Sequence, residues 1–114
     1  MKIVNLTPHD INIVDDSGNI LKTYPKSGCV ARIDEKPYEL SYHIDGVKCY
    51  STINQGLVYI GDTSVLDEAD YFIVSGQVFD TVDDMRYIQP DTFGNAVRND
   101  KGHIIGVKAF KVKE

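Results

Sequence analysis

An Asp-Gly dipeptide between two β-type runs constrains the fold more than any other feature of the sequence. Asp45 and Gly46 lie within residues 39–52, whose flanking runs are rich in tyrosine and β-branched side chains. Asp-Gly readily supplies the two positive φ angles of a tight type I′ turn, whose twist matches that of the antiparallel strands it joins. The sequence therefore predicts a β-hairpin over residues 39–52.

Turn signals recur along the rest of the chain and separate further short β-type runs. The runs expected as strands are residues 2–6, 10–14, 20–24, 30–33, 56–60, 97–99 and 104–112. Residues 10–14 and 20–24 are expected to pair as a hairpin, and a turn at Asp100-Lys101-Gly102 is expected to join the last two runs. A chain of 114 residues has room for one core of ordinary size. We therefore expect a single domain, residues 1–114, that is mainly antiparallel β, either a small barrel or a sandwich, with one or two short helices.

The segment 71–74, Tyr-Phe-Ile-Val, is continuously apolar, as is typical of a strand covered on both faces. It ends at Ser75 and Gly76, where Ser75 can cap a short helix whose apolar side chains share one face. A second helical turn is expected at residues 64–69. A strand that leads into a helix leaves backbone N–H groups unpaired, and these favour an anion such as phosphate.

Charge and hydropathy limit the partners. A formal net charge of -5 argues against a general nucleic-acid binder, which needs a basic face. The N-terminus turns polar within a few residues and no run approaches the ~20 apolar residues of a membrane span, so we expect no membrane association and a cytoplasmic location. Cys29 and Cys49 form no CxxC pair and are expected to be ordinary core or surface residues.

Several short motifs occur in a fixed order along the chain. They are Asn5-Leu6-Thr7-Pro8-His9, Pro25-Lys26-Ser27-Gly28-Cys29-Val30-Ala31-Arg32, Ile73-Val74-Ser75, Arg86, Pro90 and Val97-Arg98-Asn99-Asp100-Lys101-Gly102. In this order the chain resembles a family of small, mostly uncharacterised proteins encoded by phages and prophages. Relatives commonly carry Arg-x-Asp where this chain has Arg86-Tyr87-Ile88. The resemblance covers nearly the whole chain and implies a phage accessory protein that works in the cytoplasm of the host cell.

All three arginines fall inside these motifs, whereas the lysines are scattered. A guanidinium group grips phosphate with two parallel hydrogen bonds and stacks on aromatic rings. Arg32, Arg86 and Arg98, set beside the helix N-terminus at Ser75 and Gly76, are therefore expected to form a pocket for a phosphorylated ligand. The alternative is that the arginines form structural ion pairs with the abundant acidic residues.

Four further residues are candidates for the same pocket. Tyr87 follows Arg86 and offers a ring on which a base can stack, and Asn99 follows Arg98. Thr7 and His9 lie in a turn that is expected to form the opposite wall. The alternatives are that Tyr87 fills half-buried sheet surface and that His9 caps a turn.

The sequence carries no pattern typical of an enzyme, such as HxH, HExxH or a nucleophile between glycines. We expect no catalysis, no metal and no cofactor. The expected function is capture of a small phosphorylated nucleotide, for example by a sponge that sequesters a nucleotide signal of antiviral defence. A homo-oligomer is expected because small domains gain ligand burial by sharing a pocket. The alternatives are a virion-associated or host-protein-binding structural protein and, more weakly, a phosphohydrolase that uses His9 and Asp10.

Overall fold

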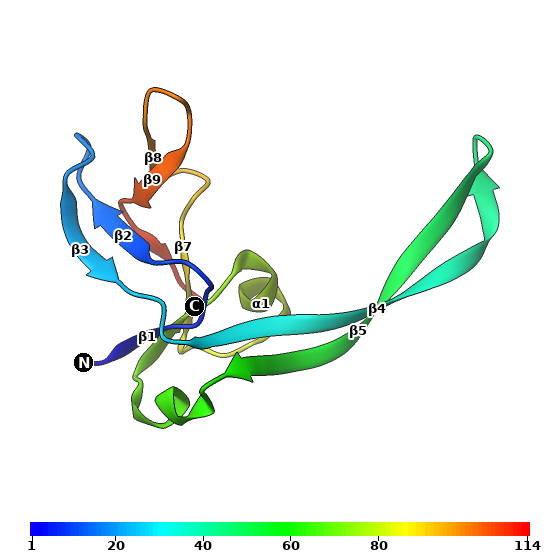
Figure 1. Ribbon diagram of the computed structural model, residues 1–114, viewed down its shortest axis with the longest axis horizontal. Helices are drawn as coiled ribbons and strands as arrows, with labels where there is room; N and C mark the ends of the chain where they lie inside the picture. Colours follow the sequence, from blue (N-terminus) through cyan, green and yellow to red (C-terminus); the bar gives the residue numbers. More distant parts are fainter.

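The computed structural model describes all residues, Met1–Glu114, and shows a folded body from which a long hairpin arm projects (Figure 1). The arm consists of β4 (Cys29–Ile44) and β5 (Val47–Gly61), and the molecule reaches 51 Å along its longest axis. At its tip Asp45 and Gly46 have φ angles of 51° and 77°, which confirms the predicted turn. The hairpin is longer than predicted because β5 continues through residues 56–60, which were expected to form a separate strand.

Two four-stranded sheets form the body. The first has the order β1 (Ile3–Asn5), β6 (Tyr71–Ile73), β7 (Tyr87–Pro90) and β10 (Phe110–Lys111). The second has the order β3 (Ile20–Tyr24), β2 (Ile11–Val14), β9 (Ile104–Val107) and β8 (Ala96–Arg98). The β-rich class is confirmed, and the sheets stay open rather than closing into the small barrel considered from the sequence.

The first sheet departs from the predicted antiparallel arrangement. Strand β6 pairs in parallel with both β1 and β7, and β2 also meets β9 in parallel. Parallel partners are joined by long connections, so no local turn marks them in the sequence. The two predicted hairpins of the second sheet, β2 with β3 and β8 with β9, are antiparallel and confirmed.

Two short helices complete the body, as predicted. They are the 3₁₀ helix η1 (Thr63–Glu68) and the α-helix α1 (Gly76–Thr81). The Ser75 side chain accepts a hydrogen bond from the Val78 backbone N–H, which confirms Ser75 as the N-cap. Neither helix has the length and apolar character needed to cross a membrane.

The core lies where the first sheet meets α1 and the base of the arm. Its main cluster consists of Val4, Leu6, Cys29, Ala31, Ile33, Phe72, Val74, Val78, Phe79 and Tyr87. On β4 the alternation of buried Ala31 and Ile33 with exposed Arg32 follows the predicted strand pattern. Beyond Ile33 no residue of the arm is buried, so the core holds the arm only at its base. Both cysteines are free thiols, Cys29 in the core and Cys49 half-buried on the arm.

Candidate functional site

A cleft of about 360 Å³ opens at the carboxyl ends of β1, β6 and β7. Because these strands run parallel, the loops that follow them meet at one edge of the sheet. Clefts at the carboxyl ends of parallel strands are the usual ligand sites of open α/β sheets. The residues that line this cleft are Thr7, Pro8, His9, Ile11, Val74, Ser75, Gly76, Gln89, Pro90 and Thr92.

The structure brings four of the nine predicted site residues into this cleft. Thr7 and His9 come from the loop after β1, and Ser75 and Gly76 from the start of α1 after β6. The two segments lie far apart in the sequence and meet because β1 and β6 are neighbours in the sheet. The predicted contact between the Thr7-Pro8-His9 turn and the start of the helix is therefore present.

The three arginines do not join them. Arg86 forms a two-pronged contact with Asp84, in which its Nη2 lies 2.9 Å from Oδ2. Arg32 is exposed on β4, with Nη2 3.7 Å from an Asp34 carboxylate oxygen. Arg98 belongs to the second sheet, where its Nη1 donates to the Gly102 carbonyl oxygen at 2.7 Å. None lines the cleft, so the predicted pocket of three arginines is not formed within the protomer.

Tyr87 and Asn99 also lie elsewhere. The Tyr87 side chain is part of the core, with 3% of the residue exposed, and its ring meets Phe72 edge to face at 5.7 Å between ring centres. No face of the ring is open to a stacking base. Asn99 Oδ1 accepts hydrogen bonds of 3.0 Å from the backbone N–H groups of Lys101 and His103 and so shapes the turn between β8 and β9. Both residues stabilise the fold in this arrangement.

One wall of the cleft depends on Asn5, which the sequence did not single out. Asn5 is 2% exposed, and its Nδ2 donates to the carbonyl oxygens of His9 at 2.7 Å and Tyr24 at 2.9 Å. Its Oδ1 accepts from the backbone N–H of Thr7 at 2.9 Å and from the Thr7 hydroxyl at 2.7 Å. The Asn-x-Thr-Pro spacing is the signal that predicts it, because asparagine readily bonds the backbone two residues on.

The exposed surface of the remaining lining is mostly apolar and almost uncharged. Apart from His9, it contains no ionisable side chain. Gln89, which no sequence pattern singled out, lies against Gly76: a Cβ atom added to Gly76 would lie 2.8 Å from the Gln89 Nε2.

Asp10, which follows His9, holds a structural contact. Its carboxylate accepts a hydrogen bond from the Lys26 backbone N–H at 2.9 Å. No three His, Cys, Asp or Glu residues are grouped as metal ligands would be. The arrangement suits a ring system that carries a few polar groups at its edge.

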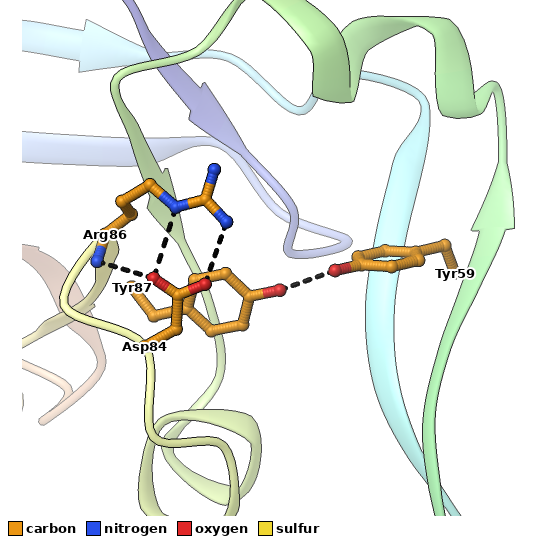
Figure 2. A network of polar contacts seen from close by, with 4 residues as sticks. All are labelled: Tyr59, Asp84, Arg86 and Tyr87. Atoms are coloured by element: carbon orange, nitrogen blue, oxygen red, sulfur yellow. Dashed lines mark hydrogen bonds and ion pairs between the residues drawn. The ribbon is translucent and has the colours of Figure 1, made fainter.

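A second polar group joins the arm to the body (Figure 2). The hydroxyl of Tyr59 on β5 lies 2.5 Å from that of Tyr87 on β7. Next to it, Arg86 lies over the Phe72 ring at 5.6 Å, and its guanidinium group lowers the pKa of the Asp84 carboxyl by hydrogen bonding. Burial, followed by the hydrogen bond with Tyr59, raises the pKa of Tyr87 above its ordinary value of 10.0.

The shift at Tyr87 makes stability depend on alkaline pH. Because the folded protein holds the Tyr87 proton more tightly than the unfolded chain, this contribution is complete below pH 10 and is lost as the pH rises above 10. We expect the free energy of unfolding, measured in urea, to fall over this range. The fall should be smaller in Tyr87→Phe, while Tyr42→Phe, which changes an exposed residue of the arm, should follow the wild type. Identical slopes in all three proteins would contradict this assignment.

No protein-family model matches the chain, and neither a curated protein nor a solved structure is significantly similar to it. Two features of the fold are therefore the basis for inferring function: the cleft at the ends of three parallel strands, and the exposed arm.

Proposed function

We propose that the protein is a non-catalytic binding protein that takes a small ligand into the cleft. The observation that supports this most strongly is the convergence of three loops, two of them motif segments, at the carboxyl ends of three parallel strands. A volume of about 360 Å³ lies at the lower end of the range of ligand pockets, which suits one nucleoside-sized group.

The chemistry of the lining supports a nucleotide as the ligand class. The side-chain amide of Gln89 offers both a donor and an acceptor, as the edge of a base requires, and Thr92 adds a hydroxyl. The imidazole of His9 is the only lining group that can carry positive charge toward a phosphate. Resemblance of the motifs to small phage-encoded proteins supports the further proposal that the ligand is a nucleotide signal of antiviral defence, captured without turnover.

Filling the cleft should abolish binding. Cyclic dinucleotides, cyclic trinucleotides and ADP-ribose derivatives are suitable probes, and one of them should raise the melting temperature of the wild type by about 10 °C at a concentration 100-fold above its Kd. Thr92→Trp, which places an indole in the cleft, should remove this rise and the heat of binding in calorimetry. Phe93→Trp is the matched control, because Phe93 is fully exposed outside the cleft. Failure of every probe to bind the wild type would overturn the proposal.

The arm favours a second candidate function, in protein interaction. Near its tip Tyr42, Ile44 and Val47 are 53%, 65% and 66% exposed. Apolar side chains gathered on a projecting hairpin are typical of a contact surface, and a virion protein or a host protein is the partner class considered from the sequence. Mass spectrometry of natively purified protein discriminates the two candidates: a co-purified nucleotide supports the cleft, and a co-purified protein supports the arm.

A further inference from the structure

The arm is amphipathic, with different side chains on its two faces. Neighbouring residues of a strand point to opposite faces, and residues paired across the hairpin share a face. The face that leads into the core carries buried Ala31 and Ile33 at the base and Glu35 beyond them, where Gln77 of α1 donates a hydrogen bond to Glu35. The opposite face, here named the outer face, carries the apolar residues Val30, Tyr38, Ile53, Val58 and Ile60.

The protomer leaves most of the outer face uncovered, although Val30 and Val58 at the base are partly buried. Tyr38, Ile53 and Ile60 are 43%, 49% and 48% exposed, although each has a large apolar side chain. A two-stranded hairpin is marginally stable by itself in water. Apart from the Tyr59–Tyr87 contact at the base of the arm, the only hydrogen bond between side chains of the arm and the body is the one between Glu35 and Gln77. The extended arm therefore has the properties of an element that gains its stability from a contact on its outer face.

We propose that a second copy of this chain packs on the outer face, with the two arms antiparallel across a two-fold axis. In such an interface the same patch contacts itself, so it must be self-complementary in charge as well as apolar. With the axis between Arg32 and Asp34, Ile60 of one copy lies opposite Ile53 of the other, so apolar residues meet across the interface. This proposal concerns the arm alone and does not depend on the ligand of the cleft.

The charges on the outer face have the required pattern. Arg32, Asp34 and Lys36 follow one another along this face of β4 with alternating sign. An axis that passes between Asp34 and either neighbour sets each Asp34 against a cation of the other copy. Arg32 lies 3.7 Å from Asp34 in a loose, exposed contact, so both groups can also bond across an interface. A partner of uniform charge would leave one sign unmatched, whereas a second copy matches both.

The size of the face is also sufficient. Strands of 15 and 16 residues have a contour length of about 50 Å, and two strands with their side chains are about 10 Å wide, so an arm offers at most about 500 Å². Two arms packed face to face along this whole length bury about 1,000 Å² in total, which reaches the lower limit for a specific interface. The dimer should therefore form at micromolar concentrations and depend strongly on single residues of the outer face.

The test uses the full-length chain and two neighbouring positions of β5. Ile53 pairs with Lys36 on the outer face, and Thr52 pairs with Pro37 on the other face. In Ile53→Glu the new carboxylate meets Lys36 within its own protomer, so the hairpin is preserved while the interface gains a buried charge. Thr52→Glu adds the same charge to the exposed opposite face. Circular dichroism and thermal melting verify that both variants fold.

Light scattering after gel filtration, at micromolar concentrations, gives the outcome. Wild type and Thr52→Glu should have twice the protomer mass of 12.8 kDa, and Ile53→Glu should have the protomer mass. A monomeric wild type would overturn the proposal, and so would an Ile53→Glu variant that remains dimeric. An arm that binds a different protein while the purified chain stays monomeric would also overturn it.

Discussion

Asn5→Ala is expected to lower the free energy of unfolding by about 3–5 kcal/mol, which is a large part of the stability of a small domain. The substitution removes four side-chain hydrogen bonds at a residue that is 2% exposed. It leaves the Thr7 N–H without its acceptor and the Tyr24 carbonyl oxygen without its side-chain donor, whereas the His9 carbonyl oxygen keeps the Thr7 hydroxyl at 2.9 Å. A buried polar group without a partner costs about 1–3 kcal/mol, so losses at several groups add up to the expected effect.

The matched control is Asn99→Ala. Asn99 also uses its side-chain oxygen to hold a turn, but the residue is exposed and water can replace the lost bonds. We expect this variant to lose less than about 1 kcal/mol. Urea unfolding monitored by circular dichroism measures both. Equal losses in the two variants would show that Asn5 is an ordinary turn residue and that the wall of the cleft does not depend on it.

Gly61→Ala should be the most damaging substitution on the arm. Gly61 ends β5 at the base of the arm with a φ of 105°, and a Cβ atom there would lie 2.0 Å from the Gly28 carbonyl oxygen. Backbone cannot move aside as a flexible side chain can, so the two strands must separate where they enter the core. We expect a loss of at least about 3 kcal/mol, since both the positive φ and the clash contribute.

Gly56→Ala separates these two contributions. Gly56 lies on the same strand with a φ of 99°, but a Cβ atom there meets nothing within 4 Å. Alanine at this position should lower the free energy of unfolding only through the strain of the positive φ, by about 1–2 kcal/mol. Urea unfolding of both variants, with gel filtration to detect loss of compactness, measures the difference. A Gly61→Ala protein as stable as Gly56→Ala would contradict the close approach of Gly28 and Gly61.

Local signals predicted most elements of the fold. The Asp45-Gly46 turn, the hairpin of β2 and β3, the turn between β8 and β9 and the Ser75 cap depend on neighbouring residues, and all four are present. Each is specified by the φ angles or side-chain hydrogen bonds of a few consecutive residues.

Long-range pairing was not predictable in the same way. The register Ile3↔Tyr71 joins strands that are far apart in the sequence, and nothing local marks them as parallel partners. This pairing decides the site, because it brings Thr7 and His9 beside Ser75 and Gly76. The arginines show the converse. Arg86 and Arg98 both belong to the motif segments, yet Arg86 directly precedes β7 of the first sheet and Arg98 lies in β8 of the second.

The arm illustrates a third limit. Its turn and its strands were visible in the sequence, but a pattern of alternating residues does not say whether a hairpin lies on a core or projects from it. Ala31 and Ile33 are buried and no residue beyond them is, because the arm leaves the body there and projects away from it (Figure 1). Projection from the body is what turns a predicted hairpin into a candidate interface.

A crystal structure of the protein with the nucleotide that binds it most tightly tests the proposed function most directly. We expect the nucleotide in the cleft, with polar contacts to Gln89 and Thr92 and with its phosphate on the side of His9. A nucleotide bound at Arg32, Arg86 or Arg98 with the cleft empty would contradict the proposal.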